Sequence, residues 1–359
     1  MTTFVSYVWR SSATGARVAR MALAPLSWLF GAIVARRNAG FDRRARRGAL
    51  AVPALPALSV GNLTVGGTGK TPVASWFVSR LRASGASPAL VLRGYGDDEW
   101  RVHGLLTPGV PVVVAAERAV GLVTARREQC DCAVLDDAFQ HRQVARLEDV
   151  VLVSADAWQE PLRLLPSGPY REPLESLNRA SVAVITVKAA SADTVQVVRA
   201  AIRRAAPSVP IAQLRLAPGG VRLAATIVGN AQSVPHELQH DMAWLRGRET
   251  LLVSAIADPD AFGQQMAAAG AVVRHHAVFP DHHAFGAGDV SDIVARAGPS
   301  VAVVCTLKDA VKLVPLWPRA GAALWYLSQT VVVEQGAEIL EQVVARVLAA
   351  RRAITPTAG

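Results

Sequence analysis

The sequence is short of cysteine, lysine and charged residues in general, and each shortage excludes a class of protein. Its 359 residues include only three cysteines, which are too few for a disulfide framework and lack the partners of a zinc site. We interpret Cys130, Cys132 and Cys305 as small buried residues of a protein in a reducing compartment, the cytoplasm. Charged residues make up 18% and hydrophobic residues 51%, so the chain can build a large core and is not globally disordered. This length favours two domains over one.

Positive charge is scarce after the first fifty residues. Residues 1–50 hold nine arginines and one acid, Asp42, and so carry eight of the ten net positive charges. The rest is nearly balanced and has no basic stripe interleaved with aromatic residues. We therefore expect no nucleic-acid partner, and nothing in the sequence implies an obligate protein partner.

The basic N-terminal arm contains one apolar run, Met21–Ala35, with two arginines on each side. As a helix this run spans about 22 Å, short of the roughly 30 Å of a bilayer core, so we expect it not to cross a membrane. Arginines follow the run where a signal peptide has a small-residue cleavage site. A core helix and a helix in the membrane interface both remain possible. Trp9, Trp28 and Phe30 beside clustered arginines favour the interface of an anionic membrane.

Beyond the arm, short apolar strands alternate with helical segments, which predicts an α/β fold with a parallel sheet covered on both faces. The first strands are predicted at Ala57–Val60, Ala89–Leu92, Val110–Ala115, Ala133–Leu135, Val150–Val153 and Val182–Val187. A second series is predicted at Thr250–Ile256, Val272–Phe279, Val301–Thr306 and Ala323–Leu327, with 216–229 as the connection. We expect an N-terminal amphipathic helical arm at 1–48, a P-loop NTPase-type domain at 49–217, a smaller α/β domain at 218–334 and a C-terminal helix at 335–359.

A glycine-rich loop, GNLTVGGTGKTP, occupies residues 61–72 between a predicted strand and a predicted helix. Its glycines let backbone N–H groups point at a phosphate, and the helix N-terminus adds partial positive charge. Lys70 is one of only four lysines in a chain that otherwise uses arginine. It is placed to reach the β- and γ-phosphates of ATP, and the Thr71 hydroxyl to hold Mg²⁺. The predicted ATP-binding residues are Thr64, Val65, Gly66, Gly67, Thr68, Gly69, Lys70 and Thr71.

A second Mg²⁺ ligand is expected at the end of an apolar strand. The strand at 132–135 is followed by two carboxylates, Asp136 and Asp137. Asp136 is the better candidate for the metal.

Several motifs occur in a fixed order and together resemble one kinase family. They are VGNLTVGGTGKTP, LRGYG at 92–96, DDAFQH at 136–141, LPSGPYREP at 165–173, FPDHHAF at 279–285 and TLKDAVK at 306–312. With the arm, including PLSWLFG, they resemble the tetraacyldisaccharide 4'-kinases of lipid A biosynthesis over nearly the whole chain. The resemblance implies transfer of the ATP γ-phosphate to the 4'-hydroxyl of an acylated glucosamine disaccharide 1-phosphate, which forms lipid IVA. It also implies a peripheral position at the cytoplasmic face of the bacterial inner membrane.

The same resemblance implies roles for individual residues. Asp98 resembles the family's catalytic aspartate, and His282 resembles its histidine partner, which we expect to come from the second domain. Asp137 is implied as a further catalytic residue. The other implied active-site or substrate residues are Glu99, Arg118, Gln140, His141 and Arg171. Lys308, Asp309 and Lys312 are expected to organise the second domain, although Lys312 on an exposed helix face is an equal alternative.

The sequence also departs from the family pattern. The segment before Asp98 is short, so Asp97 is an alternative catalytic carboxylate. Leu307, Ala138 and Glu148 stand where Glu, Gly and Arg are usual, but none of the three lies in the phosphate loop.

A membrane-associated ATPase switch of the partitioning type is the strongest alternative function. Such proteins carry an extra lysine just before the two glycines, and this chain has Val65 there.

Overall fold

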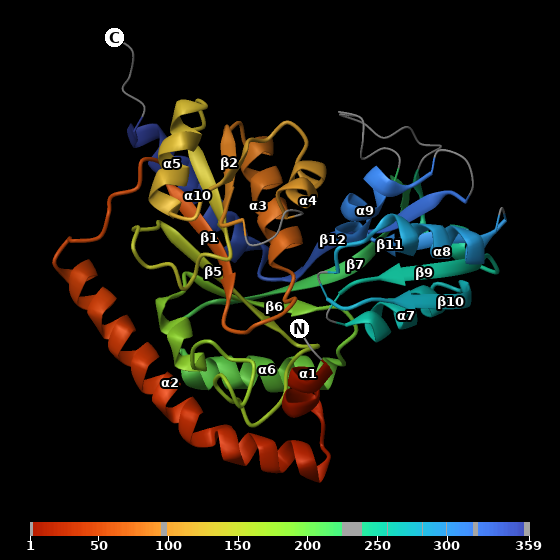
Figure 1. Ribbon diagram of the computed structural model, residues 1–359. Coiled ribbons are helices and arrows are strands. Elements are labelled where there is room, and N and C mark those ends of the chain that lie inside the picture. The colour runs from red at the N-terminus through yellow and green to blue at the C-terminus, as the bar shows by residue number, and fades with distance from the viewer. Residues whose placement is uncertain are drawn as a thin grey trace. The chain divides into compact units, whose positions relative to one another are not determined.

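The computed structural model describes residues 3–94, 99–224, 239–256, 258–281, 283–298, 300–318 and 322–354. The chain forms two compact units. Of the described residues, the larger unit contains those within 3–94, 110–216 and 331–354, and the smaller unit contains those within 99–109 and 217–330. Figure 1 identifies the helices and strands.

The elements of the larger unit include the whole N-terminal arm and the C-terminal helix. Its helices are α1 (Thr3–Arg10), α2 (Thr14–Arg46), α3 (Lys70–Ala83), α5 (Arg118–Arg127), the 3₁₀ helix η1 (Leu174–Arg179), α6 (Ala192–Ala205) and α10 (Ala337–Ile354). Its strands are β1 (Ala57–Asn62), β2 (Pro88–Leu92), β3 (Val112–Val114), β4 (Cys132–Asp136), β5 (Glu148–Ser154) and β6 (Val182–Val187). Two long strands, β7 (Ile211–Leu223) and β12 (Leu324–Gln335), begin in one unit and end in the other.

The sheet of the larger unit has the strand order β7-β6-β5-β1-β4-β2-β3, and every registered pair in it is parallel. Successive residues of a strand point to opposite faces, so an apolar run such as β5 needs helices on both sides. Val150 packs in one buried cluster with α3 and α10, and its neighbour Val151 packs in another with α6 and η1. This arrangement confirms the predicted α/β fold with a parallel sheet covered on both faces.

The smaller unit has its own parallel strands, in the order β10-β9-β11-β12. Its strands are β8 (Gln239–His240), β9 (Glu249–Ser254), β10 (Val272–Val278) and β11 (Ala302–Thr306). Its helices are α4 (Glu99–Leu106), η4 (Met242–Leu245), α7 (Pro259–Ala268), α8 (Ala287–Ala297), α9 (Leu307–Leu313) and η5 (Val314–Leu316). The Thr306 side chain accepts from the Asp309 backbone N–H and so caps the first turn of α9.

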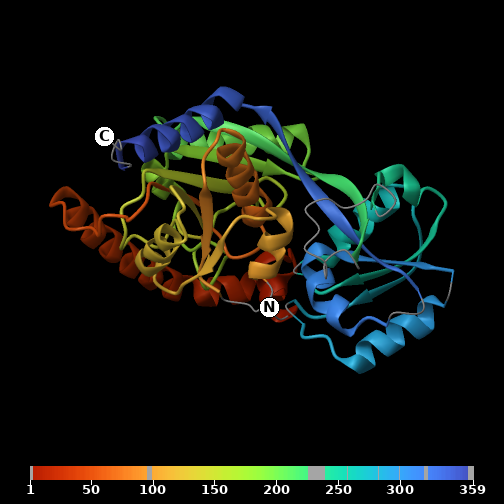
Figure 2. The same cartoon turned by 90° about the horizontal axis from the view of Figure 1, so that it is seen from above.

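The N-terminal helix is much longer than its apolar run, and the expectation that it does not cross a membrane stays a prediction. α2 has 33 residues and extends about 50 Å, because the arginine-rich segment after Ala35 continues the helix. By length and composition alone it is the one described helix that could cross a membrane. In the structure it lies along the larger unit, on the side away from α10 in the view of Figure 2.

Two expectations about the domains need correction. Residues 99–109 belong to the smaller unit and not to the phosphate-loop domain, because α4 packs against α9. The expected connection at 216–229 begins as the second half of β7, a regular strand through Leu223, and 225–238 lie outside the described residues.

Candidate active site

The phosphate loop connects β1 to α3 in the larger unit. Gly69 is the N-cap of α3 in the left-handed region, with φ of 87°. A Cβ there would lie 2.3 Å from Cδ1 of Leu216, so both the backbone conformation and the space require glycine. Gly66 also has a positive φ, of 116°. Lys70 and Thr71 form the first turn of α3, where backbone N–H groups have no partner inside the helix.

A second segment, 169–171, which is part of the LPSGPYREP motif at 165–173, holds the phosphate loop from the side. The Val65 N–H donates to the Pro169 carbonyl at 2.8 Å, and Thr64 forms an isolated antiparallel bridge with Tyr170. The Arg171 N–H donates to the Leu63 carbonyl at 2.7 Å. The structure therefore gives this part of the motif a role in supporting the loop.

Charged side chains meet at the end of β4, beside the phosphate loop. Val60 of β1 is in register with Asp136, the last residue of β4. Asp137 Oδ1 lies 3.0 Å from a guanidinium nitrogen of Arg171 and 3.8 Å from Lys70 Nζ. The backbone of Asp137 has a φ of 47°, a conformation that non-glycine residues adopt rarely but that Asp tolerates. The local chain therefore holds this carboxylate between the two cations.

Burial by itself raises the pKa of the Asp137 carboxyl. The charges of Lys70 and then Arg171, with a hydrogen bond from Arg171 and the charge of Arg118, outweigh burial and hold the pKa below its usual value. Asp137 is therefore ionised at neutral pH and balances part of the positive charge.

Asn62, at the end of β1, is the centre of the hydrogen bonds around this cluster and was missed by the sequence analysis. Its side-chain oxygen accepts from Lys70 Nζ at 3.3 Å and also from Arg171. Its carbonyl accepts from Gln140 Nε2 at 2.8 Å and from Arg171 at 3.2 Å. Asn62 is fully buried at the end of β1, and its burial and its contacts with distant segments, which no sequence pattern shows, identify it.

His141 follows Gln140 in the same turn. Burial, followed by the positive charges of Arg118 and Arg146, lowers its pKa. Its imidazole is therefore neutral at neutral pH.

Arg118 is buried beside the end of β4. Its side chain is only 2% exposed, and its guanidinium donates to the carbonyls of Ala115 and Asp136, each at 2.9 Å. These bonds hold the end of β4 in place. The resemblance suggested a phosphate or substrate contact, and the described contacts are with the backbone.

Buried polar atoms without a hydrogen-bond partner among the described residues gather around this site. They are Thr68 Oγ1, Gln140 Oε1, His141 Nε2 and Arg171 Nε. Buried polar atoms are normally paired, so such a group indicates that a polar ligand or water completes their bonding.

The N-terminal helix is joined to both loops of the site. Glu172, which follows Arg171, is fully buried and accepts from Arg37 at 2.9 Å and from Asn38 at 3.1 Å, both on α2. Arg142, which follows His141, donates to the Asn38 carbonyl at 3.1 Å. Neither link was predicted from the sequence.

Of the remaining predicted active-site residues, one is described and three are not. Glu99 is the first residue of α4. Asp97, Asp98 and His282 lie outside the described residues. Of the described residues around them, Gly94 belongs to the larger unit, and Glu99, Asp281 and His283 belong to the smaller unit. The expectation that Asp98 and His282 come from different domains therefore stays a prediction.

Asp309 and Lys312 of the TLKDAVK motif make contacts within the smaller unit. Asp309 is fully buried and accepts from the Thr306 hydroxyl at 2.6 Å. Lys312 is half-buried and donates to the His283 carbonyl at 3.4 Å, so it is not on a fully exposed face. Lys308 lies in the first turn of α9, before Asp309.

Comparisons with known proteins identify relatives of nearly the whole chain. The family model for tetraacyldisaccharide-1-P 4'-kinase matches residues 19–105 and 104–348. A tetraacyldisaccharide 4'-kinase of Azoarcus sp. is 34% identical over 95% of this chain and 96% of its own length. That of Halorhodospira halophila is 33% identical over 89% of this chain and 90% of its own.

A solved structure has a similar fold. It is described as the "apo" form of LpxK from Aquifex aeolicus in complex with ATP, and it aligns with a TM-score of 0.68 and 23% identity over 91% of this chain and 99% of that one. Since the family model covers most of the sequence and the curated relatives match at nearly full length, the chain belongs to the tetraacyldisaccharide 4'-kinase family, the kinases of lipid A biosynthesis.

Proposed function

We propose that this chain transfers the γ-phosphate of ATP to the 4'-hydroxyl of an acylated glucosamine disaccharide 1-phosphate at a membrane surface, forming lipid IVA. The observation that carries the proposal is the phosphate loop, with Lys70 beside the Asp137–Arg171 pair, in a chain of this family. Phosphoryl transfer depends on positioning and on neutralising the charge of the phosphoryl group, and this cluster supplies both cations and fixed dipoles.

ATP fits the phosphate loop by its chemistry. The loop glycines and the first turn of α3 provide backbone N–H donors, and Lys70 provides the charge. The unpartnered Thr68 hydroxyl lies in the same loop and is free to donate to an oxygen of the nucleotide. Arg171 is the second cation within reach of the transferred phosphate.

Mg²⁺ fits the donor set at the neighbouring strand end. Among the residues that the structure describes, no group of three or more His, Cys, Asp or Glu side chains forms a closed metal cage. Mg²⁺ that binds with a nucleotide needs only one or two protein ligands, because phosphate and water supply the others. Thr71 and Asp136 are the proposed ligands, and the bound ion would neutralise charge on the β- and γ-phosphates.

Acceptance of the hydroxyl proton is assigned by the family resemblance to Asp98 with His282. An imidazole beside a carboxylate can bring the pKa of the pair closer to the operating pH, where a general base is most effective. His141, whose imidazole is neutral, and Gln140 lie beside the phosphate cluster and are proposed to bind the reacting groups.

The membrane contact is proposed from the exposed face of α2. We name as the apolar stripe the residues Val18, Met21, Leu26, Trp28, Leu29 and Ile33, each more than half exposed. The one arginine between Val18 and Ala35, Arg20, is turned inward and is 8% exposed. An uncharged helical face flanked by exposed arginines suits the interface of an anionic bilayer, with the helix lying in the membrane plane. The proposed position is peripheral, at the cytoplasmic face of the inner membrane.

Labelled ATP and purified disaccharide 1-phosphate in detergent micelles test the function. We expect label in the lipid product and ATP turnover that depends on the disaccharide. ATP turnover that responds to vesicles alone, with no labelled lipid, would support the ATPase-switch alternative and reject the kinase.

A further inference from the structure

A cavity of about 800 Å³ lies between the first half of α2 and the loop 159–167, within the larger unit. Its apolar lining comes from Met21, Ala24 and Trp28 on the helix and from Pro161, Leu162 and Leu164 on the loop. Hydrogen bonds fix its border: the Ser27 hydroxyl donates to the Leu164 carbonyl at 3.0 Å, and Trp9 Nε1 donates to the Pro166 carbonyl at 2.9 Å. The loop that forms one wall of the cavity is therefore fixed to the N-terminal helices by hydrogen bonds.

Positive charge lines the same cavity. Arg17, Arg20 and Arg163 contribute three guanidinium groups, and Glu160 is the only acid among the lining residues. Arg20 is kept in place by donation to the carbonyls of Val8 and Ser11. Burial, and then the charge of Arg20, lowers the pKa of Arg163, as expected where cations are crowded without enough anions.

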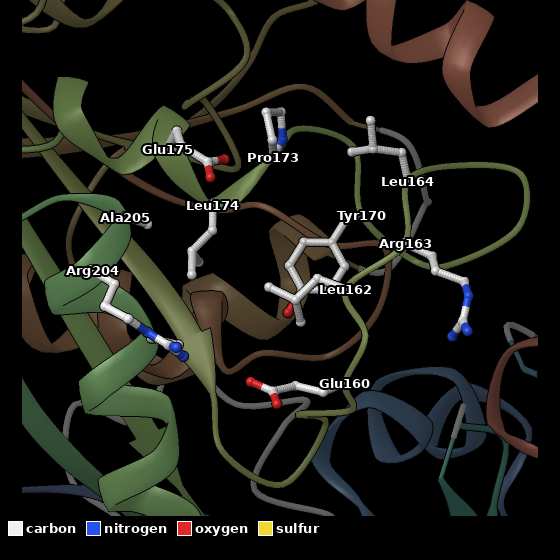
Figure 3. Close-up of a pocket in the computed structure, with 11 residues that line it drawn as sticks. Glu160, Leu162, Arg163, Leu164, Tyr170, Pro173, Leu174, Glu175, Arg204 and Ala205 are labelled. Carbon is white, nitrogen blue, oxygen red and sulfur yellow. The ribbon is translucent and has the colours of Figure 1, made fainter. Parts of the chain in front are cut away.

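Arg163 lines this cavity and also a second, smaller one, which Tyr170 and Leu174 line as well. In Figure 3, which shows the smaller cavity, the Arg163 side chain extends away from Tyr170 and Leu174. Its one described hydrogen bond, to the Pro161 carbonyl, is long at 3.4 Å. The guanidinium can therefore bind an anion without giving up a strong bond.

The cavity opens beside the apolar stripe of α2. Met21 and Trp28 line it and are also part of the stripe, with exposed fractions of 66% and 78%. An amphiphile in the membrane that contacts the stripe can therefore reach the cavity without leaving the apolar surface. A cavity with an apolar wall and a cationic end fits a ligand with an acyl chain and a phosphate.

We propose that this cavity binds one anionic phospholipid of the membrane, with its phosphate on Arg17, Arg20 and Arg163 and an acyl chain along Met21 and Trp28. The proposal rests on the proposed membrane contact of α2 and involves no step of phosphoryl transfer. None of the phosphate-loop residues, nor Asp137 or Arg171, lines the cavity, so it is separate from the candidate active site.

Calorimetric titration of the full chain with dihexanoylphosphatidylglycerol, below its micelle concentration, tests the proposal. We expect saturable binding of one molecule per chain, weakened about tenfold or more by Arg163→Gln, because a charge-assisted hydrogen bond is lost. Arg43→Gln removes the same charge from an exposed position of α2 outside the cavity and should change the affinity less than about twofold.

A second pair of variants tests the apolar wall without changing charge. Ala24→Phe fills the cavity and should weaken binding, whereas Ala32→Phe, on the exposed face of α2 but outside the cavity, should not. Equal losses for Arg163→Gln and Arg43→Gln, or binding of inorganic phosphate or dihexanoylphosphatidylcholine as tight as that of the anionic lipid, would overturn the proposal.

Displacement of the phospholipid by the disaccharide 1-phosphate would assign the cavity to the acceptor and also overturn it. The binding is measured without ATP, and each variant is assayed for phosphoryl transfer in detergent micelles. Loss of lipid binding with normal transfer, or the reverse, therefore distinguishes the failure of this proposal from the failure of the proposed kinase reaction.

Discussion

Lys70 is the residue on which the proposed transfer depends most directly. Lys70 is the only lysine of the phosphate loop. Its ammonium group donates to the Asn62 side-chain oxygen and forms an ion pair with Asp137. We expect Lys70→Ala to lower kcat by about 10²–10³, because charge on the transferred phosphoryl group is no longer neutralised. Lys188→Ala, at an exposed position outside the site, is the control. Retention of more than about a tenth of the wild-type rate would reject the phosphate-loop assignment.

The pKa of the Asp137 carboxyl should change when Lys70 is replaced, because the charge of Lys70 lowers it. Its pKa is lowered in the folded protein, so its contribution to the free energy of unfolding is complete above the usual carboxyl pKa and is lost as the pH falls through the folded value. Lys70→Met removes the largest opposing charge, so we expect the pKa of Asp137 to rise. Titration of its carboxyl carbon by NMR measures the shift. An unchanged value, with Lys188→Met as the reference, would show that the two side chains do not interact in solution.

The C-terminal helix α10 forms two ion pairs that differ in burial and can be compared, Arg346–Glu148 and Arg80–Glu341. Glu148, which stands where the family usually has Arg, is 4% exposed and accepts two bonds from Arg346 of α10. Removing Arg346 leaves a buried carboxylate unpaired, so we expect Arg346→Ala to lower the free energy of unfolding by about 1–3 kcal/mol.

Arg80→Ala breaks the Arg80–Glu341 pair, in which both side chains are about half exposed, and should cost about 0.5 kcal/mol or less. Denaturant unfolding of both variants measures the difference. Equal effects would show that Glu148 is not held by Arg346.

The elements also show what could be predicted from the sequence. Strand β6 is found at the predicted bounds, Val182–Val187, because a fully buried strand is a continuous apolar run with turn residues on each side. The length of α2 was underestimated because arginine, a strong helix former, continues a helix beyond its apolar run. β7 was taken for a connection because Pro218-Gly219-Gly220 lies inside it, and proline and glycine usually end a strand.

For the candidate site, motif spacing predicted which loops come together but not the contacts among them. The phosphate loop and Asp137 were found from sequence because their chemistry is tied to short motifs. Asn62 and Glu172 act through side-chain geometry between distant segments, and no local pattern marks them. The burial of Arg118 was not predicted, because it depends on the packing of α5, which the neighbouring residues in the sequence do not reveal.

At the scale of the whole molecule, the apolar stripe should decide how the protein associates with membranes. Truncating the arm is a poor test, because Arg37 and Asn38 hold the buried Glu172 beside the site. Leu29→Asp with Ile33→Asp places charges on two stripe residues that are 59% and 58% exposed and do not line the lipid cavity. We expect sedimentation with anionic vesicles to fall by about tenfold or more, with unfolding unchanged.

Val52→Asp is the control for this membrane test. Val52 is an apolar residue, 87% exposed and outside α2, and a charge there should have little effect. Undiminished sedimentation of the Leu29 and Ile33 variant would reject the interfacial role of the stripe.

The proposed base can be tested without reference to any domain movement. Asp98 and His282 lie outside the described residues, so a series of variants is the direct test of their pairing. If the two residues form one proton-accepting group, Asp98→Ala and His282→Ala should each lower kcat strongly, and the double variant should lose little more than the worse single variant. The affinity for ATP should hardly change, because the phosphate loop belongs to the larger unit and neither residue is assigned to it. Rate losses that multiply in the double variant would show that the two residues act independently. Repeating the series of wild type, two single variants and double variant with Asp97→Ala in place of Asp98→Ala identifies which carboxylate is the partner of His282.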